Sequence, residues 1–175
     1  MKTKSKWYVI TGGPSSGKST VLSCLEKMDY RIIPEAARVL IDEEMAKGKT
    51  LEEIRKDEAG FQQKVLIIKV RIEKELPRDQ IIFFDRAIPD SLAYYQLSGL
   101  NSKEVLEDCQ KDQYKRVFLM EQLPFDQDYA RTEDAQTIEK LNQLLKQTYE
   151  QLGYEVVLVP AMSVEERVRF IQDYM

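Results

Sequence analysis

The feature that most constrains this chain is a glycine-rich segment at residues 12–19 that directly follows a strand-like run at residues 7–11. The segment reads Gly-Gly-Pro-Ser-Ser-Gly-Lys-Ser and fits the pattern G-x-x-x-x-G-K-[ST] without a mismatch. Its glycines let the backbone curl so that successive N–H groups face one centre, and the N-terminus of the next helix adds its positive dipole end there. The strand, loop and helix together predict a phosphate-binding loop suited to a triphosphate.

Individual residues of this loop have expected roles. Lys18 is expected to bridge the β- and γ-phosphates of ATP, and the Ser19 hydroxyl to occupy one position of a Mg²⁺ shell. Thr20 is expected to begin the buried face of a helix that opens at Lys18 and continues through the apolar residues Val21, Leu22, Leu25 and Met28. The predicted nucleotide-binding residues are Gly12, Gly13, Pro14, Ser15, Ser16, Gly17, Lys18, Ser19 and Thr20.

Length and composition limit the remaining possibilities. The chain has 175 residues, of which 43% are hydrophobic, so residues 1–175 are expected to form a single domain. A net charge of −4 argues against nucleic acid as a partner and favours small charged ligands. With no histidine and only two cysteines, Cys24 and Cys109, the chain lacks the residues for histidine-based catalysis or a disulfide framework. No stretch has the apolar length of a signal peptide or membrane span, which predicts a cytoplasmic protein.

Strand-like runs alternate with helical patterns along the chain. Strands are expected at residues 7–11, 31–33, 81–84, 117–120 and 155–159. The last three are continuously apolar, which is typical of strands covered on both faces of a parallel sheet. Between them, apolar residues recur at helical spacing in two sets, one at Phe61, Val65, Ile68 and Ile72 and the other at Ile138, Leu141, Leu145 and Leu152. This alternation predicts a doubly wound α/β fold with ligands at the carboxyl ends of the strands.

The segment after Pro160 predicts a helix, whereas residues 121–134 predict a loop. Pro160 and the capping box from Ser163 to Glu166 mark the start of the helix, which should bury Val164, Val168 and Ile171. The loop is the one long stretch without periodicity, and it follows the carboxyl end of a predicted strand. Loops of that length often have a function, so we expect a lid over bound nucleotide there.

Glu35 and Arg38 follow the short second strand and lie one helical turn apart in the expected helix. They have two interpretations. The first is an i,i+3 surface ion pair that contributes a few tenths of a kcal/mol. The second is functional, with Glu35 as a base or orienting group for an acceptor hydroxyl and Arg38 as a substrate-binding cation.

Asp85 and Arg86 end the most hydrophobic predicted strand. Asp85 at this position is expected to make a water-mediated Mg²⁺ contact, and Arg86 to reach a phosphoryl group. The alternative is that Asp85 only caps the helix that begins near Pro89. Asp90, in the first turn of that helix, is explained by its favourable interaction with the helix dipole.

Arg131 is the single arginine among five acidic residues at positions 121–134. It is a candidate catalytic residue that a closing lid would bring to the transferring phosphoryl group. Alternatively, it compensates Asp128 or Glu133 at the surface. Phe125 and Tyr129 in the same segment are expected to pack the lid down, with stacking on a base as the second interpretation.

Several segments together resemble a known family, namely ITGGPSSGKST, IPEAAR, FFDRAIPDSLAYY, DYARTED and VVLVPAMSVEERVRFI. They look like the AAA-type ATPase and kinase-like P-loop family that includes the ribosylnicotinamide kinase domain of bacterial NAD-biosynthesis proteins. The resemblance implies a nucleoside and nucleotide kinase-like fold with sheet order 2-3-1-4-5 that binds ATP, or sometimes GTP, with Mg²⁺. The Asp85-Arg86 pair also resembles the segment of thymidylate kinases that contacts metal-bound water and acceptor phosphate. Ala36 replaces an aromatic residue of the ribosylnicotinamide kinase pattern.

Two function classes follow. The first is a small-molecule kinase, in which Lys18, Mg²⁺ and Arg131 stabilise the γ-phosphoryl group while Glu35 orients the acceptor. The second is a nucleotide-dependent ATPase or switch that regulates a partner protein. Within the first class, the acidic lid favours a nucleoside acceptor such as nicotinamide riboside, whereas Arg38 and Arg86 favour a phosphorylated acceptor.

Overall fold

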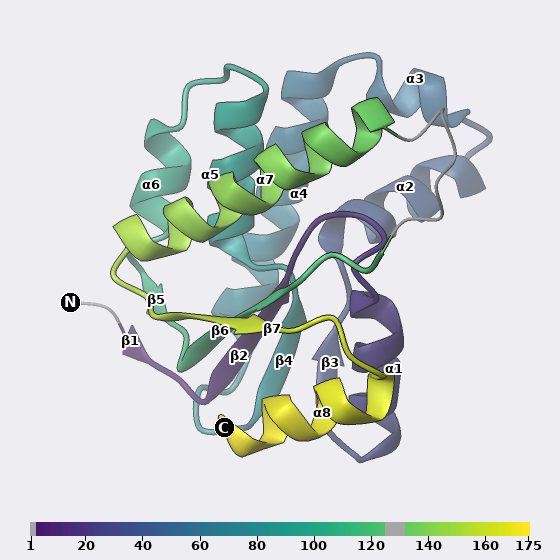
Figure 1. Ribbon diagram of the computed structural model, residues 1–175. Helices are drawn as coiled ribbons and strands as arrows, with labels where there is room; N and C mark the ends of the chain where they lie inside the picture. Colours follow the sequence, from purple (N-terminus) through teal and green to yellow (C-terminus); the bar gives the residue numbers. More distant parts are fainter. Residues whose placement is uncertain (1–2, 125–131) are drawn as a thin grey trace.

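The computed structural model describes residues 3–124 and 132–175, and its centre is a parallel sheet (Figure 1). The sheet has five strands in the order β3-β4-β2-β6-β7, which is order 2-3-1-4-5 along the chain and confirms the predicted fold. The strands are β2 (Trp7–Thr11), β3 (Arg31–Ile33), β4 (Ile82–Asp85), β6 (Arg116–Met120) and β7 (Val156–Val159). Each strand starts or ends within one residue of the predicted range. A further short parallel pair, β1 (Thr3–Lys4) with β5 (Asp112–Gln113), had no signal in the sequence.

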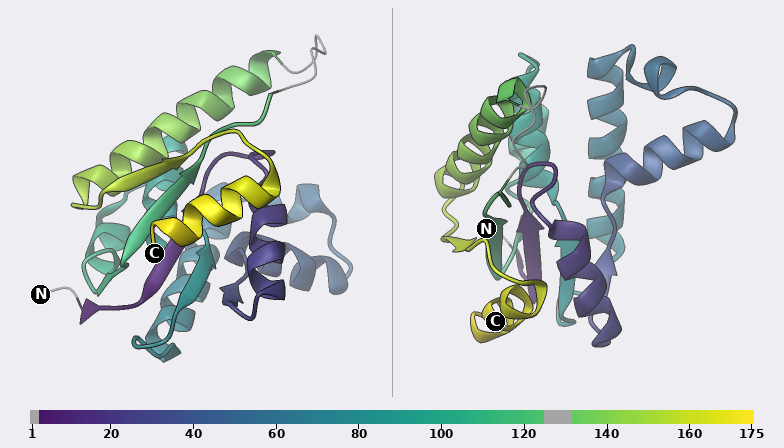
Figure 2. Two further views of the ribbon diagram at one scale, coloured as in Figure 1. Left: turned by 60° about the horizontal axis from the view of Figure 1, so that its bottom comes forward. Right: turned by 45° about the vertical axis from the view of Figure 1, so that its right-hand side comes forward.

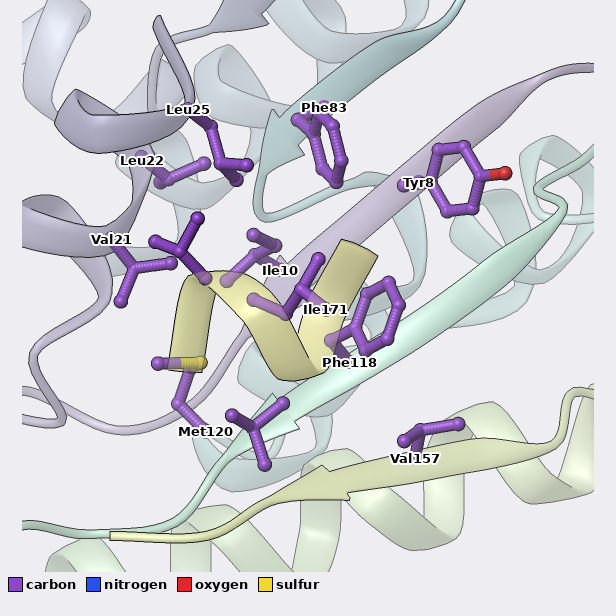
Figure 3. Close-up of a cluster of buried hydrophobic side chains, with 12 residues drawn as sticks. Tyr8, Ile10, Val21, Leu22, Leu25, Phe83, Phe118, Met120, Val157 and Ile171 are labelled. Carbon is purple, nitrogen blue, oxygen red and sulfur yellow. The ribbon is translucent and has the colours of Figure 1, made fainter. Parts of the chain in front are cut away.

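Two layers of helices cover the sheet because alternate residues of each strand point to opposite faces. On one face, Ile10 and Phe83 pack with residues of α1 (Lys18–Lys27) and α8 (Val164–Asp173), as Figure 3 shows. On the other face, Trp7, Val9 and Phe84 pack with Tyr149 of α7 (Thr132–Gln151). Figure 2 shows α7 on one side of the sheet and α8 on the other.

The remaining helices extend the second layer and its upper end. They are α2 (Ala36–Ala46), α3 (Leu51–Arg55), α4 (Glu58–Glu75), α5 (Ile88–Leu97) and α6 (Lys103–Asp108). Helices α2, α3 and α4 together join β3 to β4, and Figure 1 shows α2 and α3 reaching away from the sheet. In the described part of the chain, none of the helices has the length and apolar character that crossing a membrane requires.

Helix boundaries follow the sequence signals closely, with two corrections. The α8 capping box is present, since the Ser163 hydroxyl accepts from the Glu166 N–H and the Glu166 carboxylate accepts from the Ser163 N–H. Thr20, however, is exposed, so the buried face of α1 begins at Val21. The predicted loop at 121–134 was too long, because α7 already begins at Thr132.

Candidate active site

The glycine-rich segment forms a sharp loop between β2 and α1. Gly17 is the N-cap of α1 and has φ +81°, a left-handed backbone conformation that is unfavourable for residues with a Cβ. A Cβ built on Gly17 would also lie only 3.1 Å from Arg167 Nη1 and from Leu123 Cδ1. Glycine is therefore required here both by the backbone and by close packing. No side chain caps the N-terminus of α1, which leaves its first N–H groups for a ligand.

A cavity of about 410 Å³ opens beside this loop. Its walls are the loop residues 13–20 together with Glu35, Arg38, Arg86 and Tyr94. The structure thus brings the phosphate loop together with three of the residues that the sequence singled out at other strand ends. They converge because β3 and β4 are parallel to β2 and end at the same edge of the sheet.

Lys18, which lines this cavity, forms a buried ion pair with Asp85. Lys18 Nζ lies 2.6 Å from Asp85 Oδ1, with side-chain exposures of 8% and 13%. Burial raises the pKa of Asp85, and the neighbouring Lys18 ammonium opposes that rise. The two residues were assigned separate roles from the sequence, yet here each neutralises the other's charge.

Arg86 and Glu35 form the second pair. Arg86 Nε lies 3.2 Å from Glu35 Oε1, and the guanidinium is 5.3 Å from the centre of the Tyr94 ring. Arg86 has φ +64°, which is uncommon for a residue with a side chain, and it is buried. Its Nε and Nη1 make no hydrogen bond to any described residue. This buried guanidinium therefore lines the cavity with N–H donors that remain available to a ligand.

The surface ion pair between Glu35 and Arg38 is not found among the described residues, because Glu35 turns toward Arg86 instead. Arg38 is exposed and lies on the cavity wall. The two arginines therefore reach the same cavity from different elements, Arg38 from α2 and Arg86 from the end of β4.

A smaller cavity of about 90 Å³ shares Glu35, Arg86 and Tyr94 with the first. It extends the site toward α3 and α4, where its other walls are Ala37, Arg55, Phe61, Gln62, Val65 and Lys69. The Lys69 ammonium is occupied, donating to the Ala87 carbonyl at 3.0 Å and to the Ser91 hydroxyl at 2.9 Å. Burial lowers the pKa of Lys69. The site thus has a polar end at the phosphate loop and a partly aromatic end lined by residues of α3 and α4.

Asp90 is more than the helix-dipole group expected from the sequence. It is completely buried and accepts hydrogen bonds from the Ala87 N–H, the Tyr149 hydroxyl and the Thr11 hydroxyl. These donors come from the start of α5, from α7 and from the end of β2. Asp90 therefore fixes the strand that leads into the phosphate loop.

Three residues that hold the phosphate loop from outside were not among the site residues predicted from the sequence. Gln122 Nε2 donates to the carbonyls of Pro14 and Ser15, and Asn142 Oδ1 accepts from the Gly13 N–H at 2.7 Å. Arg167, in α8, donates to the Ser16 carbonyl. Gln122 lies in the predicted lid and Arg167 in a segment that carries the family resemblance, but all three residues are distant from the loop in sequence, so only the fold shows that they contact it.

The predicted lid is described only in part. Arg131, Phe125 and Tyr129 lie outside the described residues, so their predicted roles stay predictions. The described residues 121–124 lie beside the phosphate loop, where Gln122 bonds to it and Leu123 approaches Gly17.

Comparison with known proteins places the chain in a family. A family model described as AAA domain matches residues 7–167. No relative was found among curated protein sequences.

Solved structures similar to this one include several kinases. The deoxyadenosine kinase of M. mycoides has a TM-score of 0.64 at 18% identity, with 96% of this chain and 97% of that chain covered. The thymidylate kinase of Ehrlichia chaffeensis has a TM-score of 0.65 at 15% identity, with 99% and 100% covered. The NadR protein in complex with NR has a TM-score of 0.65 at 17% identity, with 97% of this chain but only 51% of that chain covered.

At these identities the similarity establishes the fold, and the family model spans most of the sequence. The chain belongs to the AAA domain family, and it shares its fold with nucleoside and nucleotide kinases of known structure.

Proposed function

We propose that this protein is an ATP-dependent small-molecule kinase that phosphorylates a hydroxyl of a nucleoside-type acceptor. The observation that carries the proposal is the shared cavity, in which the phosphate loop and the Glu35–Arg86 pair face the same space. A protein that only binds or hydrolyses ATP has no need of a second set of charged side chains opposite the phosphates. A kinase needs it to hold the acceptor in line.

The residues present fit Mg²⁺-ATP. The Ser16 hydroxyl in the loop and two donor atoms of Arg86 are buried without a hydrogen-bond partner among the described residues, as expected of groups that bind a polyanion. Lys18 and the open N-terminus of α1 would hold the phosphates, and Ser19 and Asp85 would hold the metal ion and its waters. Mg²⁺-ATP supplies the phosphoryl group that is transferred.

The protein's own groups then have distinct tasks. Glu35 accepts a hydrogen bond from the acceptor hydroxyl and takes up its proton as that oxygen bonds to the γ-phosphorus. The bond from the γ-phosphorus to the bridging oxygen breaks in the same step, and ADP leaves. Arg86 holds the Glu35 side chain in place, since Arg86 Nε lies 3.2 Å from Glu35 Oε1. Lys18 exchanges its partner Asp85 for phosphate oxygens, and its positive charge offsets the charge of the transferring group.

Two of the structural neighbours support a nucleoside acceptor. One is a deoxyadenosine kinase, and another was solved in complex with NR. The aromatic end of the site, with Phe61 and Tyr94, suits a planar base, and Glu35 lines both this end and the cavity at the phosphate loop. We therefore retain nicotinamide riboside and common nucleosides as the first acceptors to test.

The test is phosphoryl transfer from ATP to nicotinamide riboside, to common nucleosides and to their monophosphates under identical conditions. Transfer to a nucleoside supports the proposal. Transfer to monophosphates alone would show that the acceptor is a nucleoside monophosphate and not a nucleoside. Steady ATP hydrolysis with no transfer to any acceptor would favour the alternative, a nucleotide-dependent ATPase or switch acting on a partner protein.

A variant separates the role of Glu35 from nucleotide binding. Glu35→Gln keeps the size of the side chain but cannot take up a proton, so kcat should fall about 10²-fold or more while the Kd for ATP stays unchanged. Glu43→Gln, on an exposed position of the same helix α2, is the matched control. Equal kcat for the two variants would contradict the role given to Glu35.

A further inference from the structure

Arg167 is a fully buried arginine that bonds three separate segments of the chain. It lies in α8 and is 1% exposed. Its Nε donates to the Pro160 carbonyl after β7 at 2.9 Å, and its Nη2 donates to the Glu121 carbonyl after β6 at 2.7 Å. Its Nη1 donates to the Ser16 carbonyl in the phosphate loop at 2.5 Å. One planar group thus joins the loop to the ends of two neighbouring strands.

The chemistry of these contacts is unusual for a buried cation. Removing a guanidinium from water is costly, and buried charges are normally paired with an opposite charge. Among the described residues Arg167 has no carboxylate within ion-pair distance, and its acceptors are all backbone carbonyls. A lysine has no such planar set of donors. The arrangement uses the shape of arginine to fix backbone groups.

Fixing the Ser16 carbonyl also fixes an N–H group. In a trans peptide unit the C=O and the following N–H point in opposite directions. With the Ser16 carbonyl bound to Arg167, the Gly17 N–H must point away from α8. Gln122 acts likewise on the carbonyls of Pro14 and Ser15, which orients the two N–H groups that follow them.

The three N–H groups set in this way belong to Ser15, Ser16 and Gly17, residues that line the phosphate-loop cavity. None of them donates to another described residue. Arg167 also packs directly on Gly17, since an added Cβ there would lie 3.1 Å from its Nη1. On its outer side the loop is therefore packed against Arg167, and its carbonyls are hydrogen-bonded there. Its N–H groups remain available to a ligand on the cavity side.

We propose that Arg167, together with Gln122, is a positioning residue that holds the N–H groups of the phosphate loop ready for the phosphates of the nucleotide. The proposal rests on the proposed function in that it needs a polyphosphate ligand. Arg167 itself reaches the loop from behind through the Ser16 carbonyl and is not assigned a contact with nucleotide.

The experiment measures binding of inorganic tripolyphosphate by calorimetry, because this probe has no base or sugar and reports on the loop alone. Arg167→Lys keeps the positive charge but loses the planar set of donors, and we expect it to bind tripolyphosphate about tenfold or more weakly. Arg169→Lys, an exposed position two residues away in α8, should bind like the wild type. Titrations are run well below the melting temperature of each variant.

A second variant keeps the test decisive if Arg167→Lys fails to fold. Gln122 is only partly buried, and Gln122→Leu should bind tripolyphosphate about threefold to tenfold more weakly with a melting temperature near that of the wild type. Lower melting temperatures with unchanged affinity in both variants would mean a purely structural role and overturn the proposal. Failure of the wild type to bind either tripolyphosphate or ATP would instead overturn the proposed function, and this inference with it.

Discussion

At the scale of single residues, the ion pair between Lys18 and Asp85 determines what an incoming nucleotide meets. With Lys18 Nζ and Asp85 Oδ1 2.6 Å apart, the carboxylate neutralises the lysine charge in this structure. Phosphate oxygens must therefore compete with the Asp85 carboxylate for the ammonium. Once phosphate has displaced it from Lys18, the Asp85 carboxylate can accept a hydrogen bond from metal-bound water. Asp85 would thus pair with Lys18 before nucleotide binds and with metal-bound water afterwards.

This competition gives a prediction for Asp85→Asn. The variant removes the competitor, so it should bind metal-free ATP about tenfold more tightly than the wild type, while Mg²⁺ should no longer strengthen binding. Calorimetric titrations with and without Mg²⁺ check both effects. Lys18→Ala, which should bind neither form, is the control for the site. A variant with unchanged metal-free affinity and a full Mg²⁺ response would show that Asp85 has neither role.

At the scale of elements, Asp90 joins β2, α5 and α7 through one buried carboxylate. Its bonds to the Thr11 hydroxyl, the Tyr149 hydroxyl and the Ala87 N–H hold the start of α5 against the strand that carries the phosphate loop. Arg86 lies between Asp90 and Glu35, with Nη1 3.9 Å from the Asp90 carboxylate. Through Arg86, helix α5 is thereby connected to Glu35 in the wall of the cavity.

We expect Asp90→Ala to lower the free energy of unfolding by roughly 3 kcal/mol or more, since it leaves several buried donors unpaired. Asp79→Ala, at an exposed position in the turn before β4, should change it by less than about 0.5 kcal/mol. Urea unfolding followed by circular dichroism measures both. A loss below about 1 kcal/mol for Asp90→Ala would mean that the carboxylate is not what connects these elements.

At the scale of the whole molecule, a buried carboxyl makes the stability depend on pH. Burial raises the pKa of Glu73 in α4 from 4.5 to about 8, and the hydrogen bond from the Tyr114 hydroxyl opposes the rise. The folded protein therefore holds this proton in a pH range where the unfolded chain releases it. Stability from this group is fully present below about pH 4.5 and is lost as the pH rises toward about 8.

Glu73→Gln tests this dependence, because glutamine can still accept the Tyr114 hydrogen bond but carries no titrating proton. Between pH 5 and pH 8 the wild type should lose up to about 1.4 kcal/mol of unfolding free energy per pH unit relative to the variant. Urea unfolding at several pH values measures the difference, in which other titrating groups cancel. Parallel curves for the two proteins would contradict the shifted pKa.

The sequence by itself determined the local units of this protein. The strand, loop and helix around residues 7–27 follow from local residue preferences, and so does the α8 capping box, since each involves neighbours in the chain. Continuous apolar runs located the strands, and the resemblance to the P-loop family supplied their order. The convergence of Glu35, Arg38 and Arg86 on one cavity was predictable as well, because parallel strands present their carboxyl ends at one edge.

Only the tertiary structure decided which partner each charged or polar side chain takes. Glu35 pairs with Arg86 and not with its helical neighbour Arg38, because the turn after β4 places a buried cation closer to it. Arg167 lies 151 residues from Ser16 and bonds a bare carbonyl, a kind of partner that every residue offers and that no motif can mark. Local preferences act between neighbours in the chain, whereas such contacts exist only once packing has brought distant segments within hydrogen-bond distance.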